Sequence, residues 1–201
     1  GLTDEKNLNR VFPGCPDGTE MERLAWAVSR ELQTVADYYI DLHSGDDYAT
    51  LTPYVYYAGV APEETVAESR RMAEQVDVPY MVKSNVASGG SYNYAASQGI
   101  PSILIERGGM GEWTYEEARS TRRDVRNILC HLGIYLGQKD FRTYYPLDVT
   151  DLCYQAAEEN GLWYPFKKAG DVFKKGDILG EVRDYEGNMK EMSVAEYDGV
   201  I

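Results

Sequence analysis

The sequence predicts an α/β domain built on a largely parallel sheet with helices on both faces, followed by a small all-β module. Through the first part of the chain, short runs of β-forming residues alternate with helical patterns, as in a parallel sheet. One run, "SILIE" at 102–106, is almost wholly apolar, which is typical of a strand buried on both faces. After about residue 140 the pattern changes to short strands separated by turns. We therefore expect an α/β domain over 1–145 and a barrel-like β-module over 146–201, with the boundary near 140–160.

The strands of the α/β domain are predicted from short apolar and aromatic runs. They are expected at 38–43 ("YYIDLH"), 54–58 ("YVYYA"), 80–84 ("YMVKS") and 102–106. Helices are expected from Thr19, from Pro62 to about Val76, over 91–98, and from Thr114 to Gly133. Two capping boxes, Thr19-x-x-Glu22 and Thr114-x-x-Glu117, support the first and last of these helices. The first helix is expected to bury Met21, Leu24, Ala25, Val28, Leu32 and Val35, and the last to bury Ala118, Val125, Ile128, Leu129 and Leu132.

The β-module is predicted from three Gly-Asp or Gly-Asn turns, at Gly170, Gly176 and Gly187. Its "KAGDVFKKGDILGEV" segment looks like one hairpin layer of a barrel resembling lipoyl or biotinyl domains. Carrier modules present a modifiable lysine at a hairpin tip, commonly after a methionine, and "GNMKEMS" (187–193) contains Met189-Lys190. A carrier module is therefore one alternative function for this part of the chain.

Composition excludes some classes of function. The chain has 201 residues and a formal net charge of −13, which repels phosphate backbones and anionic membranes. Three scattered cysteines argue against both a disulfide framework and a zinc ribbon. No apolar run reaches the length of a membrane span, and no signal peptide opens the sequence. We expect a soluble, cytoplasmic protein that binds neither nucleic acid nor membranes.

Two titratable side chains, His43 and Glu106, stand at the ends of predicted strands. Open α/β sheets place their ligand crevices at such strand ends. His43 ends one strand, and Asp41, two residues earlier, shares its sheet face and could orient the imidazole. The alternative is a histidine bonded to neighbouring carboxylates with no metal. Glu106 ends the apolar strand, where burial would tune it as a general base. Its alternative is an ion pair with Arg107.

Other candidates are weaker when taken alone. Asn9-Arg10, beside a Pro-Gly turn, could place a guanidinium to grip a carboxylate, and the alternative is a surface arginine. "SGGSYNY" (88–94) lacks the residues of a P-loop, and its tyrosines suit packing more than binding. His131, near the end of a helix, is expected to have a packing or dipole role.

Taken together, "NLNRVFPG", "DLHSG" and "GIPSILIERGG", in this order, resemble the succinylglutamate desuccinylase/aspartoacylase family, relatives of the zinc carboxypeptidases. The trailing "GLWYPFKKAGDVFKKGDILGEVRDYEGN" looks like the carboxyl-terminal β-module of that family. The resemblance implies a three-layer, zinc-carboxypeptidase-like α/β domain with a mainly parallel, mixed sheet. It also implies a zinc-dependent hydrolase of small N-acyl amino acids or related amides.

The resemblance assigns roles to individual positions. His43 matches the later zinc-binding histidine, Asn9 and Arg10 match the pair that holds the substrate's carboxylate, and Glu106 matches the general base and acid. Tyr92 is the candidate for an aromatic hydroxyl near the pocket. Zinc in such sites keeps one position open for water and lowers its pKa to about 7.

The sequence also departs from the family pattern. The family's upstream His-x-x-Glu zinc ligands have no counterpart, because no histidine precedes His43. We therefore expect the later portion of a longer protein, cut at both ends, that alone binds zinc weakly and has little activity. An open sheet edge could pair with a second copy, which makes a homo-oligomer a hypothesis. A metal-free protein that binds a carboxylate or a partner on the same fold is the alternative function.

Overall fold

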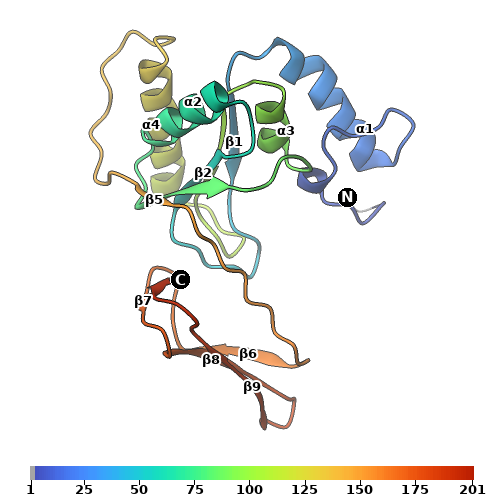
Figure 1. The fold of residues 1–201 in the computed structure, drawn as a ribbon, viewed down its shortest axis with the longest axis vertical. Helices are drawn as coiled ribbons and strands as arrows, with labels where there is room; N and C mark the ends of the chain where they lie inside the picture. The colour runs from blue at the N-terminus through green and yellow to red at the C-terminus, as the bar shows by residue number, and fades with distance from the viewer. Residues whose placement is uncertain (1–2) are drawn as a thin grey trace.

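The computed structural model describes residues 3–201 and is built on a mixed five-stranded sheet (Figure 1). Its strands lie in the order β1-β4-β2-β3-β5. They are β1 (Tyr39–His43), β2 (Tyr54–Ala58), β3 (Tyr80–Ser84), β4 (Ser102–Glu106) and β5 (Leu147–Val149). Strand β2 runs antiparallel to β4, and the other neighbouring pairs are parallel. The predicted mainly parallel, mixed sheet is confirmed, and the four predicted strands lie where the sequence places them.

Helices cover both faces of the sheet. They are α1 (Glu20–Ala27), α2 (Glu63–Ala73), α3 (Ser91–Ser97) and α4 (Tyr115–His131). On one face, Met72 of α2 and Ile128 of α4 pack with Ile103 and Ile105 of β4. On the other face, α3 packs against Leu104 of the same strand. The three layers follow from this alternation, which buries β4 on both faces as its apolar sequence predicts.

The predicted inward face of the first helix is confirmed at Ala25, which is fully buried, and is wrong at three other positions. Leu24, Leu32 and Val35 are 44%, 59% and 80% exposed, whereas Ser29 and Gln33 are buried. For Leu32 and Val35 the reason is a change of helical period, because α1 continues into a π-helical turn over Val28–Leu32 and a 3₁₀ turn over Gln33–Val35. Each of these turns departs from the regular spacing of 3.6 residues that the prediction assumed.

The last helix also buries polar residues that the sequence pattern did not single out. Its fully buried positions are Asp124, Asn127 and Ile128, while Ala118, expected inside, is exposed. The capping box at its start is confirmed, since the Thr114 hydroxyl accepts a hydrogen bond from the Glu117 amide at 3.1 Å.

Two small antiparallel sheets follow the α/β layers (Figure 1). One joins β6 (Leu162–Pro165), β8 (Ile178–Arg183) and β9 (Met189–Val194), and the other joins β7 (Val172–Phe173) and β10 (Gly199–Val200). The three predicted glycine turns are confirmed, because Gly170, Gly176 and Gly187 have φ of 89°, 92° and 91°, a region that glycine adopts without steric cost. Among residues 3–201, no helix combines the length and apolar character needed to cross a bilayer.

Candidate functional site

The candidate site lies at the edge of the sheet where β1 and β4 end and β2 begins. His43 and Glu106 are register partners in the parallel pair, and Tyr54 is the partner of Glu106 in the antiparallel pair. Strand alternation places all three side chains on the face covered by α3, because Tyr39, Tyr56 and Leu104 of the same alternating sets pack on that helix. The sequence prediction that His43 and Glu106 share one crevice edge agrees with this register.

The imidazole of His43 lies between two carboxylates. Its Nε2 is 3.1 Å from Asp41 Oδ1, and its Nδ1 is 3.9 Å from Glu106 Oε1. Asp41 comes from the same strand two residues earlier, so the period of the strand places both side chains on one face. Asp41 thus occupies one ring nitrogen and leaves the other directed toward Glu106.

This arrangement shifts the pKa of all three groups. The hydrogen bond to Asp41 raises the pKa of His43, although burial acts in the opposite direction. Burial raises the pKa of Glu106 above 4.5, and repulsion from Asp41 and Asp46 adds to this, while His43 opposes it. Burial also acts to raise the pKa of Asp41, but hydrogen bonds from His43 and Ser91 outweigh it, and the pKa is lowered. Glu106 therefore takes up a proton more readily than an exposed glutamate does.

The amino-terminal segment reaches the same edge. A short 3₁₀ helix, Leu8–Arg10, carries Asn9, whose Nδ2 lies 3.4 Å from His43 Nε2. The segment is anchored where Phe12 and Gly89 exchange two backbone hydrogen bonds of 3.0 and 3.1 Å. Arg10 is exposed, and its guanidinium donates to the Asn9 carbonyl at 2.8 Å, so it lies beside the site with its charge open to solvent. Carboxylate binding by Asn9 and Arg10 stays a prediction.

Other candidate residues have different surroundings. Tyr92 is 5% exposed and packs with Ala58 and Leu104, so its predicted contact with substrate stays a prediction that its burial does not favour. Arg107 does not pair with Glu106, because its guanidinium binds Asp124 at 2.6 Å. This removes the alternative in which Glu106 is a plain ion-pair partner of its neighbour.

The residues that the structure describes do not fit a complete zinc site. A structural or catalytic zinc needs at least three protein ligands. Within residues 3–201, no group of three or more histidine, cysteine, aspartate or glutamate side chains could hold a metal ion. His43 offers one free ring nitrogen, and Glu106 is the carboxylate nearest to that nitrogen. His131 does not contribute, since it contacts Glu68 at 3.3 Å from a different part of the fold.

Sequence reasoning missed two residues of the site. Ser91, the first residue of α3, donates a hydrogen bond from its hydroxyl to Asp41. Tyr54 faces Glu106 across the strand pair, and burial raises its pKa to about 12. Ser91 had no detectable signal, because its role depends on segments remote in sequence. Tyr54, the first residue of an apolar strand, could have been found only with the strand register in hand.

Two loops frame the mouth of the site. The loop after β1 and the loop after β4 are joined by backbone hydrogen bonds, from Gly45 N to Gly108 O and from Met110 N to Ala49 O, each 3.0 Å. A third bond, from Arg107 N to His43 O at 3.1 Å, continues the pairing of β1 with β4 past the strand ends.

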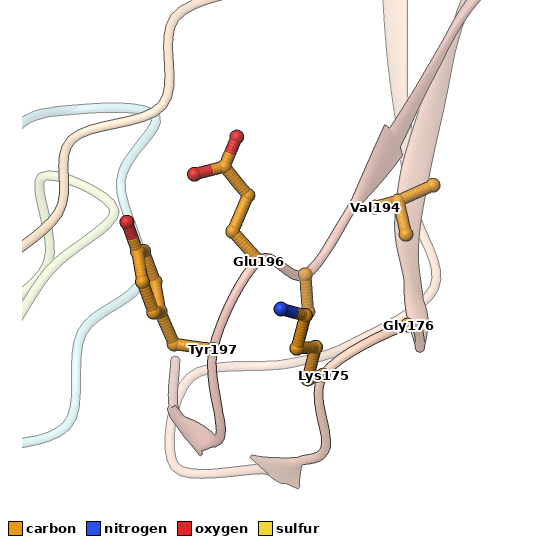
Figure 2. A pocket seen from close by; sticks show the side chains of 6 residues that line it. Lys175, Gly176, Val194, Glu196 and Tyr197 are labelled. Carbon is orange, nitrogen blue, oxygen red and sulfur yellow. The ribbon is translucent and has the colours of Figure 1, made fainter.

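A shallow hollow lies elsewhere, at the Gly176 turn of the β-module (Figure 2). Lys175, Val194, Glu196 and Tyr197 line it, and it is shallow and open to solvent. Lys190, the candidate carrier lysine, lies within strand β9 and not in the turn that precedes it.

The mixed sheet, with helices packed on both of its faces and the site at its edge, defines a protein of the zinc-carboxypeptidase-like α/β class. The family model described as "Succinylglutamate desuccinylase/Aspartoacylase catalytic domain" matches residues 3–132. The chain therefore belongs to the succinylglutamate desuccinylase/aspartoacylase family, and the resemblance seen in its motifs is confirmed.

Three relatives illustrate the likeness. The N-alpha-acetyl-L-2,4-diaminobutyric acid deacetylase of Halomonas elongata is 31% identical over 206 residues, which cover 98% of this chain and 60% of that protein. The product-bound ectoine utilization protein EutE (DoeB) of Ruegeria pomeroyi superposes with a TM-score of 0.86 at 27% identity, covering 99% of this chain and 62% of that one. A succinylglutamate desuccinylase of Silicibacter sp. TM1040 gives a TM-score of 0.85 at 28% identity, covering 98% and 61%. The chain thus spans about three fifths of the length of these relatives.

Proposed function

We propose that this chain carries the carboxylate-binding and proton-transfer part of a zinc-dependent deacylase that acts on N-acyl amino acids. The observation that carries the proposal is the pairing of Glu106 with the free Nδ1 of His43 at 3.9 Å, with Asp41 on the other ring nitrogen. Relatives named as a deacetylase and a desuccinylase support amide hydrolysis as the reaction class.

Glu106 supplies the proton transfers of the reaction. Its carboxylate accepts a proton from water as the water oxygen bonds to the amide carbonyl carbon. The same group then delivers that proton to the amide nitrogen as the carbon–nitrogen bond breaks, releasing a carboxylic acid and an amine. The raised pKa of Glu106 suits both steps, because the group must hold the proton between them.

Arg10 positions the substrate. A guanidinium at the rim of the site binds the α-carboxylate of an acyl amino acid in two-point fashion. Such binding selects amino-acid derivatives over neutral amides and holds the amide near Glu106. The exposed side chain of Arg10 is free to turn toward a bound carboxylate, since the bond that holds it is to a neighbouring backbone carbonyl.

Zinc dependence belongs to the proposed deacylase, and we infer that residues 1–201 alone bind zinc weakly. A single imidazole binds zinc weakly. Loss of groups that only hydrogen-bond to metal ligands already lowers metal affinity by about 10–100-fold, and loss of the ligands themselves should lower it further.

The first test is zinc content per chain after equilibration with excess zinc and removal of loosely bound ions. We expect a value near zero for the wild type and for His43→Ala. His131→Ala is the matched control, because the chain has two histidines and His131 lies away from the site. One tightly bound zinc per chain, lost in His43→Ala and kept in His131→Ala, would contradict the inference of a weak site.

The second test measures binding and hydrolysis of an N-acetyl amino acid at increasing zinc concentration. We expect binding that weakens in Arg10→Ala but not in Arg126→Ala, a half-buried arginine on α4. We also expect slow hydrolysis that rises with zinc and is lost in Glu106→Gln. Binding through Arg10 without hydrolysis at any zinc concentration would favour a metal-free carboxylate-binding protein. Hydrolysis that survives Glu106→Gln would refute the role of Glu106.

The absence of three metal ligands among the described residues favours that metal-free alternative as the second candidate function.

A further inference from the structure

Ser91 is held by three hydrogen bonds to residues that are each at least 50 positions away in the sequence. Its backbone N–H donates to Asn9 Oδ1 at 2.6 Å, and its carbonyl accepts from Gln33 Nε2 at 3.0 Å. Its hydroxyl donates to Asp41 Oδ2. The side chain is 5% exposed, and that of Gln33 is 2% exposed, so these bonds lie largely out of water. A buried residue with every polar group engaged is a rigid support for its partners.

Two of those partners compete for one atom of His43. Asp41 Oδ1 lies 3.1 Å from Nε2, and that contact is a hydrogen bond only if Nε2 carries a proton. Asn9 Nδ2 lies 3.4 Å from the same nitrogen and would donate only if Nε2 is unprotonated. In a neutral imidazole, Nε2 can form a hydrogen bond with Asp41 or with Asn9 but not with both. A bond to Asp41 means that the proton is on Nε2, and a bond to Asn9 means that it is on Nδ1.

The geometry favours Asp41. Its contact is the shorter one, and a hydrogen bond to an ionised acceptor is roughly twice as strong as one between neutral groups. The Asn9 amide cannot turn its oxygen toward His43, because that oxygen accepts the Ser91 N–H. Ser91 therefore orients both Asn9 and Asp41. Its hydroxyl bonds to the carboxylate of Asp41, which is the stronger partner of His43 Nε2.

We propose that Ser91 is a positioning residue, which holds Asp41 so that neutral His43 carries its proton on Nε2 and presents an unprotonated Nδ1 toward Glu106. The placement of the proton stands on the hydrogen bonds alone, and only the use of the Nδ1 lone pair in catalysis rests on the proposed function. An unprotonated Nδ1 is the form of the ring that accepts a proton or a cation.

The test is long-range ¹H–¹⁵N NMR of the imidazoles of the 201-residue chain, at a pH where both are neutral. Because the chain has two histidines, His131→Gln assigns the spectrum. In the wild type, His43 should show a protonated Nε2 and an unprotonated Nδ1. In Ser91→Ala the fraction with Nδ1–H should rise about fivefold, the factor that one ordinary hydrogen bond contributes.

Three further variants separate positioning from general loss of structure. Ser97→Ala is the matched control, since Ser97 lies on the same helix and its hydroxyl bonds to the Tyr94 carbonyl at 2.7 Å. It should leave the His43 spectrum unchanged. Ser91→Thr keeps the hydroxyl and should keep the wild-type tautomer. Asp41→Asn replaces the acceptor with an amide that can donate, and should move the proton to Nδ1 even if Ser91→Ala fails to fold.

Two results would overturn the proposal. One is a wild-type His43 with its proton on Nδ1. The other is a folded Ser91→Ala variant, shown by its backbone amide spectrum, with the wild-type tautomer. The measurement needs neither substrate nor zinc, so failure of the proposed deacylase function leaves it unaffected. Conversely, a changed tautomer in Ser91→Ala does not depend on any activity.

Discussion

Asp124→Asn tests how much of the stability of the fold depends on a buried ion pair next to the site. Asp124 is fully buried, and its Oδ2 binds the guanidinium of Arg107, itself 10% exposed, at 2.6 Å. The other oxygen of Asp124 accepts the Asp77 N–H at 2.9 Å. Arg107 follows Glu106 directly, so this pair anchors the end of β4 to helix α4.

We expect Asp124→Asn to lower the free energy of unfolding by about 3 kcal/mol. Removing one partner of a buried pair costs roughly 3–5 kcal/mol, because the remaining charge is left unpaired. The lower end applies for two reasons. Asparagine keeps the acceptor for the Asp77 N–H, and burial raises the pKa of Asp124, so the variant also removes a carboxylate that is costly to desolvate.

Urea unfolding measures this change. With a slope of about 2 kcal/mol/M, the midpoint should fall by about 1.5 M. The matched control is Asp140→Asn. The Asp140 carboxylate lies 3.6 Å from the guanidinium of Arg126 of α4, and both side chains are more than one third exposed. Its cost should be under about 1 kcal/mol.

An equal, small shift in both variants would refute the view that the buried pair is the costly one to break. A second check replaces both partners with apolar residues, as Arg107→Met with Asp124→Leu. Removing both charges should recover much of the stability lost in Asp124→Asn, because no unpaired charge remains.

Three other substitutions have defined outcomes. Thr114→Ala removes the side-chain cap of α4 and should cost about 1 kcal/mol in urea unfolding, and a change below the error of that measurement would contradict the capping role. Gly14→Ala should cost roughly 2 kcal/mol or more, because Gly14 has φ of 82° and an added Cβ would lie 2.2 Å from the Glu22 carbonyl oxygen; an unchanged melting temperature would count against it. Asp41→Asn should lower the pKa of His43, which NMR titration reports. Since the folded pKa of His43 is raised above 6.5, the stabilisation by Asp41 is present below pH 6.5 and is lost as pH rises through the folded value. The stability difference between wild type and Asp41→Asn should therefore shrink between pH 6 and pH 9, and an equal difference at both would contradict the assignment.

The order of strands and helices could be predicted because each element carries its own local signal. "SILIE" is apolar at its three central positions, and the strand it forms is buried on both faces. Strand ends marked His43 and Glu106 as candidates, and parallel pairing of β1 with β4 makes them register partners. These inferences needed only the period of a strand and the place where sheets open to ligands.

What could not be predicted depends on contacts between remote segments. Leu32 and Val35 were expected inside and are exposed because the π-helical turn over Val28–Leu32 changes the helical period, and no residue type marks such a turn. Gln33, which follows this turn, donates a hydrogen bond to the carbonyl of Ser91. The ion-pair partner of Arg107 could not be predicted for a similar reason. Asp124 approaches Arg107 only when α4 packs on the sheet.

The backbone hydrogen bonds between the loop after β1 and the loop after β4 determine which sequence changes leave the backbone of this site in place. Hydrogen bonds from Gly45 to Gly108 and from Met110 to Ala49 join main-chain atoms, so they persist when the side chains beside them change. Single substitutions on the rim can therefore change the side chains around the site, with its backbone frame intact. An insertion or deletion in either loop would instead displace both loops together, and with them the surroundings of Glu106.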